Sequence, residues 1–468
     1  MNKFSFRILA SLLVLSFFLV AAHPLTPIVR VAVIDSPVDF MHPDLRTAVN
    51  TGLLKELTVE DISGKTSWYD LNEKARYEFT KQLKIGTYKN AVDFIDAKTL
   101  NNSGDRSFAV LYRMTMGKLR YTYSEEFRQH VDAAGTYLHG THVAGIMINS
   151  IADVELITFP LIPPTFAKKM SLLEIIELTS RPTENLKNSL GMNLPSLTEQ
   201  ISKSLKEKQV RVVNMSFSNN PEQSIKSIQS SLDAEALAHL KTDPVLREKI
   251  IRFVLADVSQ AVQQWDKVIH DNPNTIFVIS AGNDGQQILD STKGLVNIKA
   301  PNVLKVAALN SNESLARFSN KSSKYVDIAA HGVAILSALS DGTKIHMSGT
   351  SMSAPEVSNY LTKIFVNNPE LSAAEGMKEL FTKHSVFDPK LDVVVANGRR
   401  LQIEPDSENL KFDITKVKDL SKFQQAVVAN LKALTGKTLK INMQDKGPPV
   451  YQTLSPKRPL VFQCKDIF

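Results

Sequence analysis

The chain has 468 residues, of which 43% are apolar, and its 55 basic and 48 acidic residues give a formal net charge of +7. This length can bury a large core, and the apolar share is ordinary for a globular protein. The charge surplus is mild and contains no run of five or more Lys or Arg residues. Because a nucleic-acid interface needs a clustered basic stripe, we exclude nucleic acid as a partner. The single cysteine, Cys464, excludes an intrachain disulfide.

The N-terminus has the pattern of a secretory signal peptide. Lys3 and Arg7 precede an apolar stretch over residues 8–20, and Ala21 and Ala22 are small residues suited to cleavage before His23. The stretch is short for a membrane span. We therefore expect residues 1–22 to be removed and the mature protein to be secreted, to the periplasm or the medium, without stable membrane association. An uncleaved anchor is the alternative.

Short apolar runs then alternate with helical patterns. Continuous apolar runs between helices are typical of buried parallel strands. Alternating strands and helices indicate a doubly wound, mostly parallel α/β sheet with helices on both faces. Ligands bind such sheets at the carboxyl ends of strands, where Asp35 and Ser216 fall. The predicted strands are 29–34, 154–159, 210–215, 275–279, 303–307 and 326–329, and the predicted helices are 197–208, 225–239 and 245–270.

Three stretches interrupt this alternation and are predicted to be insertions. They cover about residues 46–134, which carry mixed charge and several aromatic residues, 160–194, and the mostly helical 219–271. We expect one domain over residues 23–404, followed by a Lys-rich C-terminal extension over 405–468.

Three short strings carry the chemistry. Asp35 ends the first apolar run, His139 opens the string His-Gly-Thr-His-Val-Ala-Gly, and Ser351 lies within Gly-Thr-Ser-Met-Ser-Ala-Pro. A serine hydroxyl is a poor nucleophile at neutral pH, so it needs a neighbouring base, and that base needs an orienting carboxylate. Asp, His and Ser in this chain order match one of the three known orders of the serine-hydrolase triad.

Each string alone has a plainer explanation. Ser351 is also a good helix cap, and an Asp at a strand end is often a turn residue. His139 and His142 have a spacing found in metal sites, but the Glu expected between them in a metalloprotease is missing. The combination in one chain favours the catalytic interpretation.

Together the strings resemble the subtilase family of serine proteases over roughly residues 29–401. This resemblance implies that Ser351 is the nucleophile, His139 the general base and then acid, and Asp35 the orienting carboxylate. It also implies that the second histidine of the string, His142, is structural.

The resemblance extends to an oxyanion site and a substrate-binding segment. The string from Ser280 to Gly285 resembles the family's Ala-Gly-Asn turn, which implies that Asn283, helped by the Ser351 backbone N–H, stabilises the oxyanion, an effect typically worth roughly 3–4 kcal/mol per donor. Residues 212–218 resemble the family's edge strand, which implies that they pair with an extended peptide through main-chain hydrogen bonds. The implied substrate-binding residues are Ser216, Phe217, Ser218 and Gly282. Glycine is usual at position 218, so the Ser218 side chain is predicted to narrow the main specificity pocket.

The chain departs from the family pattern at several positions. Pro37 stands where glycine is usual, which brings the turn after Asp35 into question because proline cannot adopt a positive φ. His331 replaces a usual proline, and Glu356 replaces a usual histidine and is expected to face solvent. Residues 23–34 leave no room for the family's inhibitory propeptide before Asp35, so restraint of activity is assigned to another part of the chain, the C-terminal extension.

We therefore predict a secreted serine endopeptidase that forms an acyl-enzyme on Ser351 and acts on polypeptide substrates. We expect a monomer that needs no cofactor and has no metal site. Two alternatives remain: a catalytically silent binding module with this fold, and a narrowly specific processing protease whose insertions dock one partner.

Overall fold

The computed structural model describes residues 28–402 except 40–41, 43, 46–137, 152–153, 162–168, 181–193, 218–219, 293 and 340–343. Its central element is an eight-stranded sheet in the order β2-β1-β3-β4-β5-β6-β10-β9. The strands are β1 (Val29–Asp35), β2 (Val154–Pro160), β3 (Val212–Met215), β4 (Ile276–Ser280), β5 (Val303–Leu309), β6 (Ile328–His331), β9 (Ser385–Phe387) and β10 (Arg399–Leu401). All neighbours pair in parallel except β9 with β10. The predicted doubly wound α/β sheet is confirmed.

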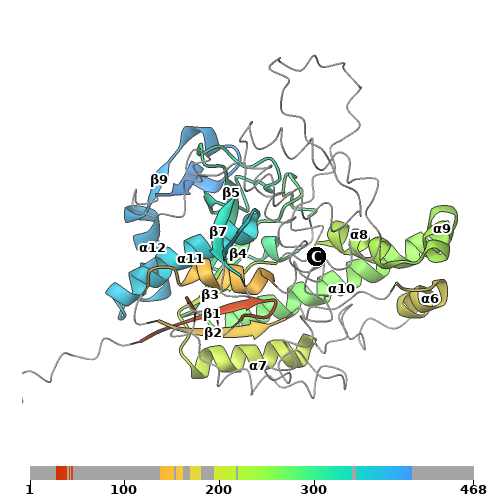
Figure 1. Ribbon diagram of the computed structural model, residues 1–468, viewed down its shortest axis with the longest axis horizontal. Coiled ribbons are helices and arrows are strands. Elements are labelled where there is room, and N and C mark those ends of the chain that lie inside the picture. Colours follow the sequence, from red (N-terminus) through yellow and green to blue (C-terminus); the bar gives the residue numbers. More distant parts are fainter. Residues whose placement is uncertain are drawn as a thin grey trace, which may run out of the picture.

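Helices cover both faces of this sheet because the central strands are apolar on both sides. In β1, Val31 and Val33 join one buried cluster, whereas Ala32 and Ile34 join another. The first cluster packs against helix α11 (Thr350–Asn367), and the second against α7 (Leu194–Glu207) and the end of α10 (Pro244–Asp271). Figure 1 shows α11 and α7 on opposite sides of the strands.

The strand order reverses at β1, and this reversal locates a binding edge. From β1 the chain passes to β2 on one side and then to β3 on the other side of β1. Crossover connections therefore diverge at the carboxyl ends of β1 and β3, which is where open α/β sheets bind ligands. Asp35 is the last residue of β1, and Ser216 directly follows β3, as the sequence predicted.

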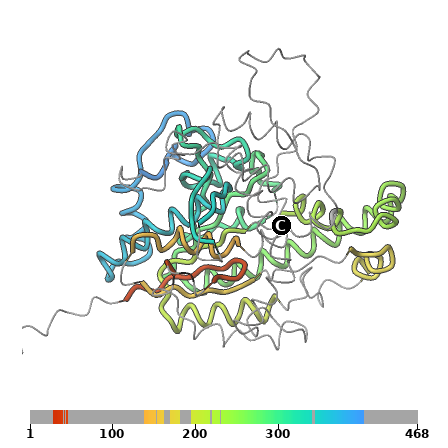
Figure 2. Tube along the Cα trace, viewed as in Figure 1, coloured from red at the N-terminus to blue at the C-terminus, as the bar shows by residue number. Residues whose placement is uncertain are grey.

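A helical unit projects from the body of the sheet between β3 and β4. It contains α8 (Pro221–Ser231), α9 (Ala234–Thr242) and the first half of α10, with α6 (Leu172–Ser180) packed against them. The second half of the 28-residue α10 instead packs on the sheet through residues such as Trp265 and Ile269. Figures 1 and 2 show α6, α8 and α9 at the far end of α10, away from the strands.

The prediction of one helix over residues 225–239 is wrong, because the chain breaks at Leu232. Leu232 is extended and forms an isolated bridge to Met170, and Asp233 caps a new helix, α9, by accepting a hydrogen bond from the Ala236 N–H at 2.8 Å. An Asp that satisfies a first-turn N–H favours a helix start over a helix interior. The helix over 225–239 is therefore two helices.

Several predictions fall outside the described residues: the signal peptide over 1–22, most of the insertion over 46–134, and the extension over 405–468. Within the described part of the chain, no helix combines the length and apolar character needed to cross a bilayer.

Candidate active site

Asp35 and His139 form a direct buried contact although they lie 104 positions apart in the sequence. The His139 Nδ1 atom lies 2.6 Å from Asp35 Oδ1, and both side chains are 1% exposed. The same carboxylate oxygen accepts the Ser36 backbone N–H at 2.7 Å. An imidazole whose Nδ1 faces a carboxylate carries its proton there, which leaves Nε2 as the basic nitrogen.

Small residues bring the histidine helix close to the Asp35 turn. Residues 138–147 are helical, and a β-carbon on Gly140 would lie 2.0 Å from the Ser36 carbonyl oxygen, so a larger residue there would push the helix away. The Gly140 N–H donates to Ser36 Oγ at 2.8 Å, and the Asp39 N–H donates to Thr141 Oγ1 at 2.9 Å. Pro37 is not among the residues with positive φ, so proline is compatible with this turn.

His142 lies on the same helix but anchors a hairpin. Its Nε2 contacts the carbonyl oxygens of Ile335 and Ile345 at 3.0 and 2.9 Å, on strands β7 (Ile335–Ala338) and β8 (Lys344–Met347). Two carbonyl acceptors require an Nε2–H donor, hence this tautomer. Burial lowers the pKa of His142 to about 3, so the ring is neutral at physiological pH.

Ser351 lies in the first turn of α11 and is held by the end of β3. Its Oγ donates to the Ser216 carbonyl oxygen at 3.0 Å, while Ser216 Oγ donates to the Ser351 carbonyl oxygen at 2.9 Å. Ser216 Oγ also accepts from Asn214 Nδ2 at 2.8 Å. The Ser351 backbone N–H belongs to the first turn of the helix, where N–H groups have no acceptor within the helix. Such N–H groups can donate to an anion that binds at the start of the helix.

Asn283 lies three residues beyond β4 and contacts the residue before Ser351. Its Oδ1 accepts from the Thr350 backbone N–H at 2.8 Å and from Thr350 Oγ1 at 2.9 Å, and Thr350 Oγ1 accepts from the Gly282 N–H at 3.1 Å. Because a backbone N–H can only donate, the Asn283 atom facing it must be the oxygen. The amide Nδ2 is therefore not the atom that contacts Thr350.

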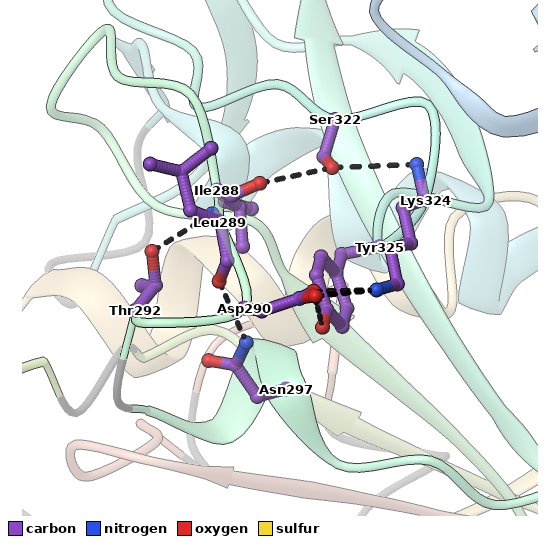
Figure 3. Close-up of polar contacts among 8 residues, drawn as sticks. All are labelled: Ile288, Leu289, Asp290, Thr292, Asn297, Ser322, Lys324 and Tyr325. Atoms are coloured by element: carbon purple, nitrogen blue, oxygen red, sulfur yellow. Dashed lines mark hydrogen bonds and ion pairs between the residues drawn. The ribbon is translucent and has the colours of Figure 1, made fainter.

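The loop that follows this turn is tied to the segment around residues 318–325. The Gly285 N–H donates to the Phe318 carbonyl at 2.6 Å, and the Ile288 N–H donates to the Lys321 carbonyl at 2.9 Å. Figure 3 shows the next contacts, in which Ser322 Oγ donates to the Ile288 carbonyl and Asp290 binds both Lys324 and the Tyr325 hydroxyl. The loop after the predicted oxyanion turn is thus held in place by hydrogen bonds to residues 318–325.

Two of the other predicted substrate-binding residues, Gly282 and Phe217, lie beside these groups. Gly282 has a φ of 99°, a backbone conformation that favours glycine. Phe217 is partly buried and packs against Trp265 of α10, with ring centroids 5.8 Å apart. Ser218 lies outside the described residues, so its predicted effect on the pocket stays a prediction.

The expectation that Glu356 faces solvent is wrong. Glu356 is only partly exposed, its Oε2 is buried, and its carboxylate takes a hydrogen bond from the His331 backbone. Burial raises the pKa of Glu356 to about 8. Two departures from the family pattern, at positions 331 and 356, therefore lie against each other.

Asp44 pairs with a cation of the chain. Its Oδ2 lies 3.4 Å from Lys344 Nζ, and its backbone N–H donates to His42 Nδ1 at 3.1 Å. Within the described ranges, no three His, Cys, Asp or Glu residues are grouped so as to hold a metal ion.

A match to the model of the subtilase family covers residues 28–400, and so includes every residue of the candidate site. The chain belongs to the subtilase family of serine proteases. Among curated subtilases, it is 35% identical to subtilisin J of Geobacillus stearothermophilus over 100 residues, which are 21% of this chain and 26% of that protein. It is 38% identical to a cuticle-degrading serine protease of Arthrobotrys oligospora over 88 residues, 18% and 20% of the two chains. The matched segments thus span about a quarter or less of these subtilases.

Two solved structures are also similar. A cold-adapted subtilisin-like serine proteinase aligns over 80% of this chain and 89% of its own, with 16% identity and a TM-score of 0.41. A lanthipeptide protease aligns over 80% and 86%, with 16% identity and a TM-score of 0.43.

Proposed function

We propose that this subtilase is a secreted serine endopeptidase that hydrolyses peptide bonds through an acyl-enzyme on Ser351. The observation that carries the proposal is the buried hydrogen bond between Asp35 and His139 at the sheet edge that also holds Ser351. A neutral His139 with its proton on Nδ1 has Nε2 available as a base, and the Asp35 carboxylate stabilises the imidazolium that forms.

The first step forms the bond between Ser351 Oγ and the scissile carbonyl carbon while the hydroxyl proton passes to His139 Nε2. In this structure that hydroxyl donates to the Ser216 carbonyl, so it must turn toward His139 when substrate binds. The carbonyl oxygen becomes an oxyanion, which Asn283 Nδ2 and the Ser351 backbone N–H stabilise. His139 then gives its proton to the leaving amine as the peptide C–N bond breaks, which leaves the acyl group on Ser351 Oγ. In the second half, His139 takes a proton from the attacking water and returns it to Ser351 Oγ as the acyl-enzyme is hydrolysed.

The end of β3 is proposed to bind the substrate backbone. β3 itself lies inside the sheet, between β1 and β4, so the proposed binding segment is Ser216 and Phe217, which follow the strand beside Ser351. An extended peptide can pair with such a segment through main-chain hydrogen bonds. The turn at Gly282 approaches the same place from β4, so the scissile bond would lie between the two segments.

Secretion rests on the signal-peptide pattern of residues 1–22, and we propose that the mature protein is a monomer over a peptidase domain of residues 23–404. Neither property is needed for the chemistry above. The extension over 405–468 and the insertions stay candidates for restraint of activity and for partner docking.

The test is digestion of several reduced, unfolded proteins of different sequence by the purified mature protein, with new N-termini identified by mass spectrometry. The matched control is Ser351→Ala. Cleavage at many sites by the wild type alone supports the proposal. No cleavage of any substrate would favour the catalytically silent module, and cleavage of one sequence type would favour the narrowly specific processing protease.

A further inference from the structure

A second buried asparagine, Asn320, forms hydrogen bonds with the turn that contains Asn283. Asn320 is 7% exposed and lies 37 positions beyond Asn283, in the loop between β5 and β6. Its Oδ1 accepts from the backbone N–H groups of Asp284 and Gln286, both at 3.0 Å, and its Nδ2 donates to the Ala281 carbonyl at 3.1 Å. Its own backbone N–H donates to the Gly282 carbonyl at 2.9 Å.

These contacts bracket Asn283 on both sides. Ala281 and Gly282 precede it, and Asp284 and Gln286 follow it, so the side chain and backbone of one residue hold the chain before and after the predicted oxyanion donor. Two backbone N–H donors fix the asparagine oxygen on their side and thereby aim Nδ2 at Ala281. A β-carbon on Gly282 would lie 2.5 Å from Asn320 Nδ2, so this amide fills the space that glycine leaves open.

The turn needs such a restraint. Gly282 and Gly285 have φ angles of 99° and 67°, and glycine has more backbone freedom than any other residue. An oxyanion donor must be preorganised, because its benefit comes from lying within hydrogen-bond distance of the transition-state oxygen before the reaction starts. Thr350 holds the Asn283 side-chain oxygen and the Gly282 N–H, but it does not bind the backbone after Asn283, which Asn320 holds at Asp284 and Gln286.

We infer that Asn320 is a positioning residue that holds the Asn283 turn in the geometry for oxyanion stabilisation. Asn320 acts through Asn283 and does not itself touch the substrate. The inference rests on the proposed function, since it assigns a supporting residue to that active site.

The experiment is a double-mutant cycle of Asn320→Ala and Asn283→Ala, with kcat and KM measured on a peptide substrate. Rates are divided by the concentration of active sites, counted by exhaustive labelling with a fluorophosphonate. Removing one oxyanion donor costs roughly 10²–10³ in kcat, and we expect Asn320→Ala alone to cost about 10–100-fold with little change in KM. In the Asn283→Ala background, where there is no donor left to position, the same change should cost less than about threefold.

Asn302 provides a matched control at the opposite edge of the sheet. It is also buried, at 4% exposure, and its Nδ2 donates to the carbonyls of Ile269, Asn272 and Thr275 near the amino ends of β4 and β5. Asn302→Ala removes a similar set of hydrogen bonds, so it should lower the unfolding midpoint while kcat per active site stays unchanged. If Asn320→Ala does not fold, Asn320→Ser, which cannot span the three bonds, goes through the same cycle.

Equal losses from Asn320 replacement in both backgrounds, or a kcat per active site equal to that of Asn302→Ala, would overturn the inference. Failure of the proposed function gives a different result, because the wild type would then neither cleave the peptide nor bind the fluorophosphonate. A different outcome is a wild type that is active and slowed by Asn283→Ala, with Asn320→Ala lowering kcat by the same factor in both backgrounds. That result would contradict the positioning role of Asn320 but not the proposed function.

Discussion

Ser216 and Ser351 exchange two hydrogen bonds, each hydroxyl donating to the backbone carbonyl of the other residue. The hydrogen bond from Ser216 Oγ to the Ser351 carbonyl is explained by the residue four positions further along α11. Pro355 is inside that helix and has no N–H, so the Ser351 carbonyl lacks its usual i→i+4 donor. Ser216 Oγ takes the place of the missing donor, and the exchange fixes the first turn of α11 against the end of β3.

This relationship predicts that Ser216 and Pro355 are energetically coupled. Ser216→Ala should lower the free energy of unfolding by about 1–3 kcal/mol, because it leaves a buried carbonyl unsatisfied. Pro355→Ala restores a helical N–H, so the cost of Ser216→Ala in that background should fall below about 1 kcal/mol. Denaturant unfolding of the four variants measures the cycle. Equal costs in both backgrounds would show that the Ser216 hydroxyl does not replace a helical donor.

A second prediction concerns the Asp35–His139 pair. Asp35→Asn keeps the shape but changes the hydrogen bond that sets the histidine tautomer, so kcat should fall by roughly 10⁴ with the fold intact. Circular dichroism checks the fold and peptide hydrolysis gives kcat. Asp44→Asn, which alters an exposed carboxylate paired with Lys344, is the control and should retain activity. An active Asp35→Asn variant would remove Asp35 from the mechanism.

A third prediction concerns His142, whose pKa in the folded protein is about 3 against 6.5 for an ordinary histidine. The unfolded chain binds a proton that the folded chain does not, so this group's stabilisation is present above pH 6.5 and is lost as pH falls toward 3. His142→Gln keeps an N–H donor for the Ile335 and Ile345 carbonyls but does not titrate. The wild type should therefore lose stability relative to His142→Gln on acidification. A constant difference from pH 7 to pH 4 would contradict this.

The fourth prediction has the opposite pH direction. The pKa of Glu356 is raised to about 8 from 4.5 by burial, so the folded state keeps a proton that the unfolded state releases between these values. Stability should then fall as pH rises from 4.5 to 8, by on the order of a few kcal/mol. Glu356→Gln removes this dependence, and its unfolding midpoint should exceed that of the wild type at pH 8.5 but match it at pH 4. A wild-type protein as stable as Glu356→Gln at pH 8.5 would rule out the buried carboxylate.

Most of the sheet could be predicted because its strands are buried on both faces. In a run such as residues 276–279 every side chain is apolar, which is the pattern typical of a central parallel strand between helices. The helix over residues 225–239 was predicted wrongly because its apolar spacing continues across Leu232. The break is set by Asp233 and by the bridge to Met170, which is a tertiary contact that no local pattern records.

Some residues of the candidate site could likewise be predicted from local sequence patterns, whereas others depend on tertiary contacts. The strings around Asp35, His139, Asn283 and Ser351 could be found because each is a local signature next to a strand or helix end. Asn320 could not, since its partners are backbone groups nearly 40 positions away, and an asparagine in a loop has no distinguishing spacing. Helical spacing alone does not reveal that α11 is buried along most of its length, so the sequence wrongly predicts a solvent-facing Glu356.

The measurement that tests the central claim most directly is labelling of the purified mature protein with a fluorophosphonate, beside Ser351→Ala and Ser353→Ala. Ser353 is a buried serine on the same helix, with its hydroxyl bonded to the Thr350 carbonyl, so it controls for general loss of a serine. We predict labelling of the wild type and of Ser353→Ala and none of Ser351→Ala. Absence of labelling in well-folded wild type, or labelling that survives Ser351→Ala, would contradict an activated nucleophile at Ser351.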